Sequence, residues 1–114
     1  MSDYFYAKKV KGVNVVAFLF SELSIEETQE LKTELYTLVT DRDNKFIIDV
    51  QKCAFLPSMV IGILVSFAAK VHEKNGRIVF CNSQEQISII FSITKLDKIF
   101  EIHGSEKEAL ESFK

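Results

Sequence analysis

Apolar residues recur with two different periods along this chain, which separates candidate strands from candidate helices. Aromatic and β-branched residues are concentrated in segments 4–10 and 13–20, on either side of Lys11-Gly12. Two such runs around a two-residue turn that contains glycine are typical of a β-hairpin. We therefore predict that the chain opens with two antiparallel strands.

A helical pattern follows the predicted hairpin. Ser24 is followed three residues later by Glu27, and this is the spacing of a capping box, in which each side chain hydrogen-bonds the backbone amide of the other residue. Leucines then recur at helical spacing until the polar segment 41–44 interrupts them. We predict an amphipathic helix that starts at Ser24 and ends before residue 41.

From residue 45 onward, short apolar runs alternate with longer helical patterns. Residues 45–50 and 77–82 are short apolar runs, as expected of strands that are buried on both faces. From Ser58 onward, apolar side chains share one helical face until Asn75-Gly76 stops the helix. The remaining expected elements are a helix at 83–94, a strand at 99–102 and a terminal helix from Ser105 that buries Ala109, Leu110 and Phe113.

This alternation of strands and helices predicts the fold class. Parallel strands in one sheet are joined by right-handed crossovers, usually through a helix. The chain has 114 residues, one proline and no repeat or low-complexity tract, so neither a linker nor a second domain is expected. We predict a single α/β domain over residues 1–114, with a mixed four- or five-stranded sheet (an N-terminal hairpin, then parallel βαβ units) and about four flanking helices.

Composition excludes several classes of protein. Apolar residues make up 47% of the chain and charged residues 26%, which is close to globular averages. The net charge is −2 and the basic residues are scattered, so no nucleic-acid partner is expected. No apolar run approaches the roughly 18 residues of a membrane span. The expected location is the cytoplasm.

Few residues offer catalytic or metal-binding chemistry. Cys53 and Cys81 could form a disulfide, but buried free thiols are expected because a cytoplasmic domain of this size needs no crosslink. His72 and His103 lack metal-ligand spacing to each other or to the cysteines, so neither a metal nor a cofactor is expected. Asp49 ends a predicted strand, yet no phosphate loop, paired carboxylates or nucleophile motif accompanies it. We expect no enzymatic activity.

A series of motifs connects the chain to a known family. They are FIIDV at 46–50, FLPSMVIGIL at 55–64, NGRIVF at 75–80 and LDKIF at 96–100. In order and spacing they resemble the STAS domain of the anti-sigma factor antagonists. That family typically has a strand ending in Asp-Leu, then Asp-Ser-Ser/Thr-Gly at a helix start, a Gly-Gly or Asn-Gly turn, and a Leu-Asp-Lys/Arg-Leu-Phe ending. The resemblance covers nearly the whole chain.

The resemblance implies a bacterial regulator of transcription that acts by partner switching and catalyses nothing itself. Its partners would be an anti-sigma factor that is also a serine kinase, and a serine phosphatase. The phosphorylated serine of the family falls on Ser58. Pro57 and Ser24 stand where family members carry acidic residues that help to present this serine. A constitutive binding module that is never phosphorylated is therefore an alternative.

Electrostatics allows two roles for Ser58. A phosphate at a helix N-terminus meets free backbone amides and the positive end of the helix dipole. It would also add a charge of about −1.5 to −2 to a docking surface, which can dissociate a partner. Serine is equally a preferred helix cap and can serve there without modification.

The amphipathic pattern of the same helix points to a docking surface without reference to any family. The centre of its buried face is predicted to be Val60, Leu64, Phe67 and Val71. No charged residue occurs from Ser58 to Ala69, whereas a solvated helix face normally carries charges. Met59 adds an adaptable side chain at the edge. We expect a partner or a second copy of the chain to cover this face; burial on both sides by its own fold is the alternative.

Both arguments together predict one partner-binding surface. Its expected residues are Ser24, Pro57, Ser58, Met59, Gly62 and Ser66. The main functional alternative is an accessory subunit of a lipid or anion transport system, because STAS domains also occur there.

Overall fold

Five strands and four α-helices are formed within residues 2–114, which the computed structural model describes. The strands are β1 (Phe5–Val10), β2 (Val13–Phe18), β3 (Lys45–Asp49), β4 (Arg77–Cys81) and β5 (Glu101–His103). The helices are α1 (Ile25–Tyr36), α2 (Ser58–Glu73), α3 (Glu85–Ile93) and α4 (Glu106–Glu111), with a 3-10 turn η1 at Leu96–Lys98. None of these helices is long and apolar enough to cross a membrane.

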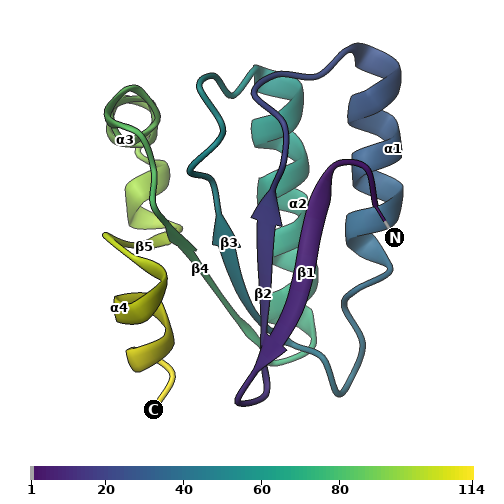
Figure 1. Cartoon of the computed structure of the whole chain (residues 1–114), viewed down its shortest axis with the longest axis vertical. Helices are drawn as coiled ribbons and strands as arrows, with labels where there is room; N and C mark the ends of the chain where they lie inside the picture. Colours follow the sequence, from purple (N-terminus) through teal and green to yellow (C-terminus); the bar gives the residue numbers. More distant parts are fainter. Residues whose placement is uncertain (1) are drawn as a thin grey trace.

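The strands form one mixed sheet in the order β1-β2-β3-β4-β5 (Figure 1). β1 and β2 are antiparallel, and every other neighbouring pair is parallel. The hairpin turn has positive φ at both Lys11 (52°) and Gly12 (83°), which is the type I′ geometry that matches strand twist. The predicted α/β fold is confirmed, with five strands in the sheet.

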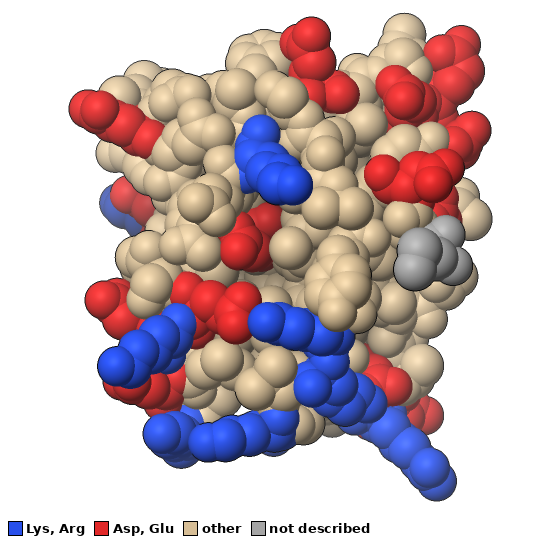
Figure 2. All heavy atoms as spheres, in the orientation of Figure 1, with Lys and Arg blue, Asp and Glu red and all other residues tan. Residues whose placement is uncertain are grey.

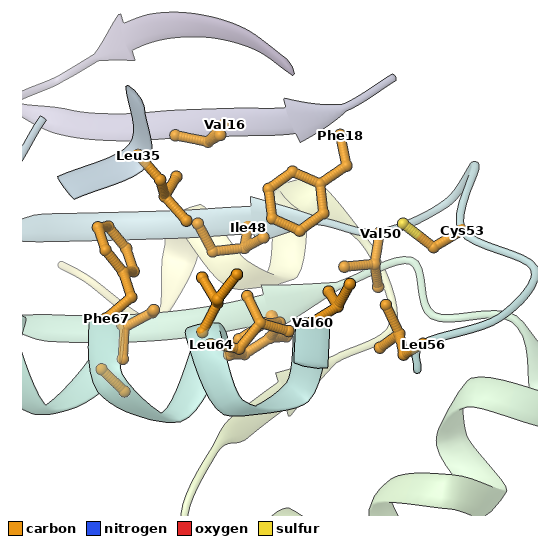
Figure 3. Close-up of a cluster of buried hydrophobic side chains, with 14 of the residues drawn as sticks. Val16, Phe18, Leu35, Ile48, Val50, Cys53, Leu56, Val60, Leu64 and Phe67 are labelled. Carbon is orange, nitrogen blue, oxygen red and sulfur yellow. The ribbon is translucent and has the colours of Figure 1, made fainter. Parts of the chain in front are cut away.

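Two hydrophobic layers lie on the two faces of the sheet. The larger one joins the sheet to α1, α2 and α3, and Figure 3 shows part of it, where Leu35, Ile48 and Leu64 approach one another. The smaller one contains Ala109 of α4, packed with Ile47 of β3 and with residues of β2 and β4. All four residues predicted for the centre of the α2 core face are fully buried.

Element boundaries differ from the sequence-based expectation around α3. This helix begins at Glu85 because Gln84 occupies the N-cap position, and the Ser83 hydroxyl bonds Ser88 Oγ at 2.7 Å. β5 begins at Glu101, later than predicted, because the preceding residues coil into η1. There Phe100 N donates to Leu96 O at 2.7 Å. Leu96 and Phe100 are both buried in the larger hydrophobic cluster.

Three aromatic rings fasten α3 and η1 to β4. Phe80 of β4 lies 5.8 Å from Phe91 of α3 and 4.6 Å from Phe100, measured between ring centroids. Phe91 and Phe100 meet edge to face at 5.8 Å. All three side chains are buried, and such aromatic pairs add stabilisation beyond area burial. The cluster therefore determines where α3 sits.

Phe91→Ala should lower the free energy of unfolding by about 3–5 kcal/mol, because it leaves a cavity inside this cluster. Ile93→Ala on the same helix is the matched control, since Ile93 is 75% exposed and its truncation should cost less than about 0.5 kcal/mol. Urea denaturation of both variants measures the difference. Equal losses would contradict the assignment of Phe91 as the anchor of α3.

Candidate functional site

The first turns of α1 and α2 lie at the same end of the molecule. β2 and β3 run parallel, and each leads through a loop into a helix, so both helices start beyond the carboxyl ends of the strands (Figure 1). In α/β sheets this is the end where ligands are usually bound. Ser24 and Ser58, predicted as site residues, occupy these two helix starts.

Apolar side chains hold the loop that leads from β3 to α2. Val50, Cys53 and Leu56 point into the core beneath this loop (Figure 3), and each is at most 2% exposed. Cys53 N also donates to Val50 O at 3.0 Å, which closes a turn. The start of α2 is therefore held in place from below.

Polar contacts hold the same loop from the side. The Asp49 carboxylate accepts from Gln51 N at 2.9 Å and from Asn82 Nδ2 at 3.1 Å. Gln84 Nε2 donates to Gln51 O at 2.7 Å. Each Asp49 oxygen is thus occupied by a structural hydrogen bond. The carboxylate joins the ends of β3 and β4, as expected of a scaffold residue.

Ser58 does not cap α2, in contrast to one of the two roles considered from the sequence. Pro57 occupies the N-cap position with φ −63° and ψ 160°, and its side chain makes no capping hydrogen bond. Ser58 is the first helical residue and is exposed. Within residues 2–114 its hydroxyl has no hydrogen-bond partner, so it is free for chemistry or for a partner.

The electrostatic setting of Ser58 favours added negative charge. The first turn of α2 contains no acidic residue, whereas those of α1, α3 and α4 each contain at least one. The leading backbone N–H groups of a helix have no partner within it and carry the positive end of its dipole. No carboxylate on the helix competes for these amides at Ser58.

The outer face of α2 is solvent-exposed and carries no charged residue from Ser58 to Ala69. Met59 is 42% and Val65 38% exposed, and Phe55 in the preceding loop is 52% exposed. Gly62 and Ser66 are also exposed. We call this set the α2 surface: Phe55, Ser58, Met59, Gly62, Val65 and Ser66. Exposed apolar residues beside small polar ones are typical of docking sites.

Two other predicted site residues have structural roles. Ser24 is exposed, but its hydroxyl accepts from Glu27 N at 3.1 Å while Glu27 Oε1 accepts from Ser24 N at 3.0 Å. This is the predicted capping box. Pro57 is half-buried at the start of α2. Sequence reasoning missed Phe55 and Val65, since an apolar residue in a loop or helix gives no sign of exposure by itself.

A model of the STAS domain family matches residues 4–109 of the chain. The chain belongs to the STAS domain family. BtrV of Bordetella bronchiseptica, provisionally named an anti-sigma factor antagonist, is 21% identical over 106 residues, which are 93% of this chain and 90% of BtrV. Family membership thus agrees with the resemblance in the motifs and with the fold.

Solved structures of anti-sigma factor antagonists share this fold. An anti-sigma factor antagonist from Mycobacterium paratuberculosis superposes with a TM-score of 0.82 at 22% identity, covering 95% of this chain and 91% of that one. The Bacillus cell fate determinant SpoIIAA in its phosphorylated form superposes with a TM-score of 0.72 at 17% identity, covering 96% of this chain and 99% of SpoIIAA. SpoIIAA has thus been solved in a phosphorylated form with this fold.

Gly62→Ala should stabilise the protein by about 1 kcal/mol, because alanine is the better helix former and a Cβ there would meet no atom within 4 Å. Gly76→Ala is the contrasting control, since its Cβ would overlap the backbone oxygen of Asn44. That variant should lose at least about 1 kcal/mol. Thermal and urea denaturation test both. A destabilised Gly62→Ala would show that this glycine is required by the fold.

Cys53 and Cys81 should be inert toward thiol reagents at pH 8 in the folded protein. Both are free and buried, and burial, aided by the Asp49 charge, raises the pKa of each to about 12. An unfolded thiol has a pKa of about 8.5. The folded state holds these protons more tightly, so the protein loses stability as pH rises above that value. Ellman's reagent with and without urea checks reactivity. Rapid labelling of the native protein would contradict this burial.

Proposed function

We propose that this STAS protein is an anti-sigma factor antagonist that works by partner switching in the cytoplasm and has no catalytic activity of its own. Its α2 surface binds an anti-sigma factor of the serine-kinase class. That kinase phosphorylates Ser58, and a serine phosphatase restores the binding form. The observation that carries the proposal is the free, exposed Ser58 hydroxyl at the first position of α2, in a chain of the STAS family.

The surroundings of Ser58 suit a switch that leaves the fold intact. A phosphate on its oxygen lies beside the unpaired amides of the helix start, which stabilise negative charge. The buried anchors Val50, Cys53 and Leu56 lie beneath the loop and away from solvent. Phosphorylation therefore changes the surface of the protein without disturbing its core.

The same phosphate opposes docking of the kinase. Phe55 and Met59 are exposed apolar side chains on the α2 surface, and a partner that covers them removes water from the surroundings of Ser58. A group with about two negative charges is costly to desolvate and repels an acidic partner surface. Binding is strong in the unmodified form and weak in the phosphorylated form.

Pro57 and Ser24 replace the acidic residues that the family uses near the phosphorylated serine. Ser24 is held in a capping box, so it offers no charge to a kinase, and Pro57 has no side-chain hydrogen-bonding group. The kinase must then recognise Ser58 through the apolar α2 surface. If it does not, the protein is a constitutive binder, which the next experiment distinguishes.

Intact-mass analysis of the protein purified from its native cell should reveal one phosphate on the wild type and none on Ser58→Ala. Ser66→Ala is the matched control, an exposed serine on the same helix, and should keep the phosphate. Samples from several growth states are needed because the switch is reversible. A phosphate retained in Ser58→Ala would move the acceptor site elsewhere. Complete absence of phosphate, with a complex still formed, would identify a constitutive binder.

Charge placed on the α2 surface should abolish partner binding. An anti-sigma factor captured from the native cell by the wild-type protein is the ligand. Gly62→Glu and Ser58→Glu are expected to weaken its binding by at least about 100-fold, as for loss of an interface hot spot. Ser92→Glu adds the same charge to an exposed position of α3 and should leave affinity unchanged. Melting temperatures verify that each variant folds. Undiminished binding by Gly62→Glu would place the interface elsewhere, and capture of membrane-transport components would favour the transport alternative.

A further inference from the structure

The first strand presents an open backbone edge. β1 is the outermost strand of the sheet and pairs with β2 alone among residues 2–114. In an antiparallel pair every second residue bonds the neighbouring strand. Tyr4 O accepts from Leu19 N at 2.8 Å, so Tyr4 and each second residue after it belong to that set. The N–H and C=O groups of Phe5, Ala7 and Lys9 therefore point to the open edge.

A groove runs between this edge and α1, which lies beside β1 (Figure 1). Its volume is about 510 Å³, and a second hollow of about 360 Å³ continues along α1. Residues of β1 and α1 line the two, among them Phe5, Tyr6, Ala7, Glu30, Glu34 and Leu38. An extended segment alongside β1 would place alternate side chains in this groove.

The groove is acidic. Among residues 2–114, Glu34 is the only charged residue that lines this groove, and Glu30 and Glu34 are the only ones that line the adjoining hollow. Glu30 accepts a hydrogen bond from the Tyr4 hydroxyl, while the Glu34 carboxylate has no hydrogen-bond or ion-pair partner within residues 2–114. Figure 2 shows Asp and Glu side chains gathered on the α1 side of the molecule. The groove therefore complements a positively charged occupant.

The lysines of β1 leave this edge accessible. Lysines commonly protect edge strands from pairing. Here Lys8 Nζ lies 3.3 Å from Glu106 of α4, and Lys9 Nζ lies 2.6 Å from Asp43 in the loop after α1. Each lysine thus forms an ion pair within its own chain, and the two pairs lie on opposite faces of the sheet. Neither closes the stretch from Phe5 to Ala7.

A second copy of the chain is a poor occupant of this groove. Pairing β1 with β1 of another copy about a two-fold axis would bring the two α1 helices together on one face. Glu30 and Glu34 of one copy would then face those of the other. Like charges at such close range oppose association.

We infer that the β1 edge binds an extended, basic segment of a partner protein, which adds a sixth strand to the sheet. Its backbone pairs with Phe5, Ala7 and Lys9, and a lysine or arginine side chain pairs with Glu34. This is strand addition with side-chain specificity supplied by the groove. The site is separate from the α2 surface, because α2 packs on another side of α1, where Tyr36 and Phe67 lie 6.2 Å apart.

A labelled hexapeptide of alternating valine and lysine is the probe. It should bind saturably and more weakly as salt rises, since Glu30 and Glu34 are near the surface, whereas a hexapeptide of valine and glutamate should not bind. The largest amide shifts in NMR spectra should fall on Phe5, Ala7 and Lys9. N-methylation of alternate residues of the peptide should abolish binding, because strand addition needs its backbone N–H groups. Equal binding of the acidic peptide, or shifts confined to the α2 surface, would overturn the inference.

Glu34→Gln should weaken binding of the lysine peptide by about fivefold, the usual effect of losing one exposed ion pair. Glu26→Gln is the matched control, because it removes an equal charge from the first turn of α1, outside the groove, and should leave affinity unchanged. Equal weakening by both variants would mean that only net charge attracts the peptide. Self-association that Glu34→Gln strengthens would make a second copy the occupant. These outcomes do not depend on Ser58 or its modification.

Discussion

The position of every other element depends on the burial of β3 on both of its faces. Phe46 and Ile48 point into the layer beneath α1 to α3, while Ile47 points into the layer beneath α4, and none of the three is exposed. Both faces of β3 are apolar, so neither can turn toward water. A shift of one residue along its neighbours would also place the side chains of each layer in the other one. Its register with β2 and β4 is therefore strongly determined, and the end of β3 is a fixed point.

The candidate site begins where β3 changes from apolar residues to a polar one. Asp49 is the first polar side chain of the strand after Lys45, and it joins the loop to Asn82 beyond β4. Apolar residues of that loop then return to the core before α2 begins. Anchored on both sides, the loop delivers Ser58 to the surface at a defined place.

Periodicity was sufficient to predict the sheet, the hairpin and the buried face of α2, because burial imposes its period directly on the sequence. Periodicity did not predict the features that depend on particular hydrogen bonds. The start of α3 depends on what the Ser83 and Gln84 side chains bond, and the free hydroxyl of Ser58 depends on Pro57 preceding it as the N-cap. Exposure of Phe55 and the groove beside β1 depend on which elements become neighbours in space, which one-dimensional patterns do not encode. Family motifs predicted a site at the start of α2 but did not predict the exposed apolar side chains around it.

The anchoring of the loop before α2 also bears on how fast the protein could exchange partners. Because the α2 surface is already formed, a partner that docks there need not order the loop, and the entropy lost on association is correspondingly small. Such preformed surfaces associate without waiting for a rearrangement, so the lifetime of each complex determines how quickly one partner replaces another. A single added charge that shortens this lifetime would free the protein for another partner as soon as the first complex has dissociated.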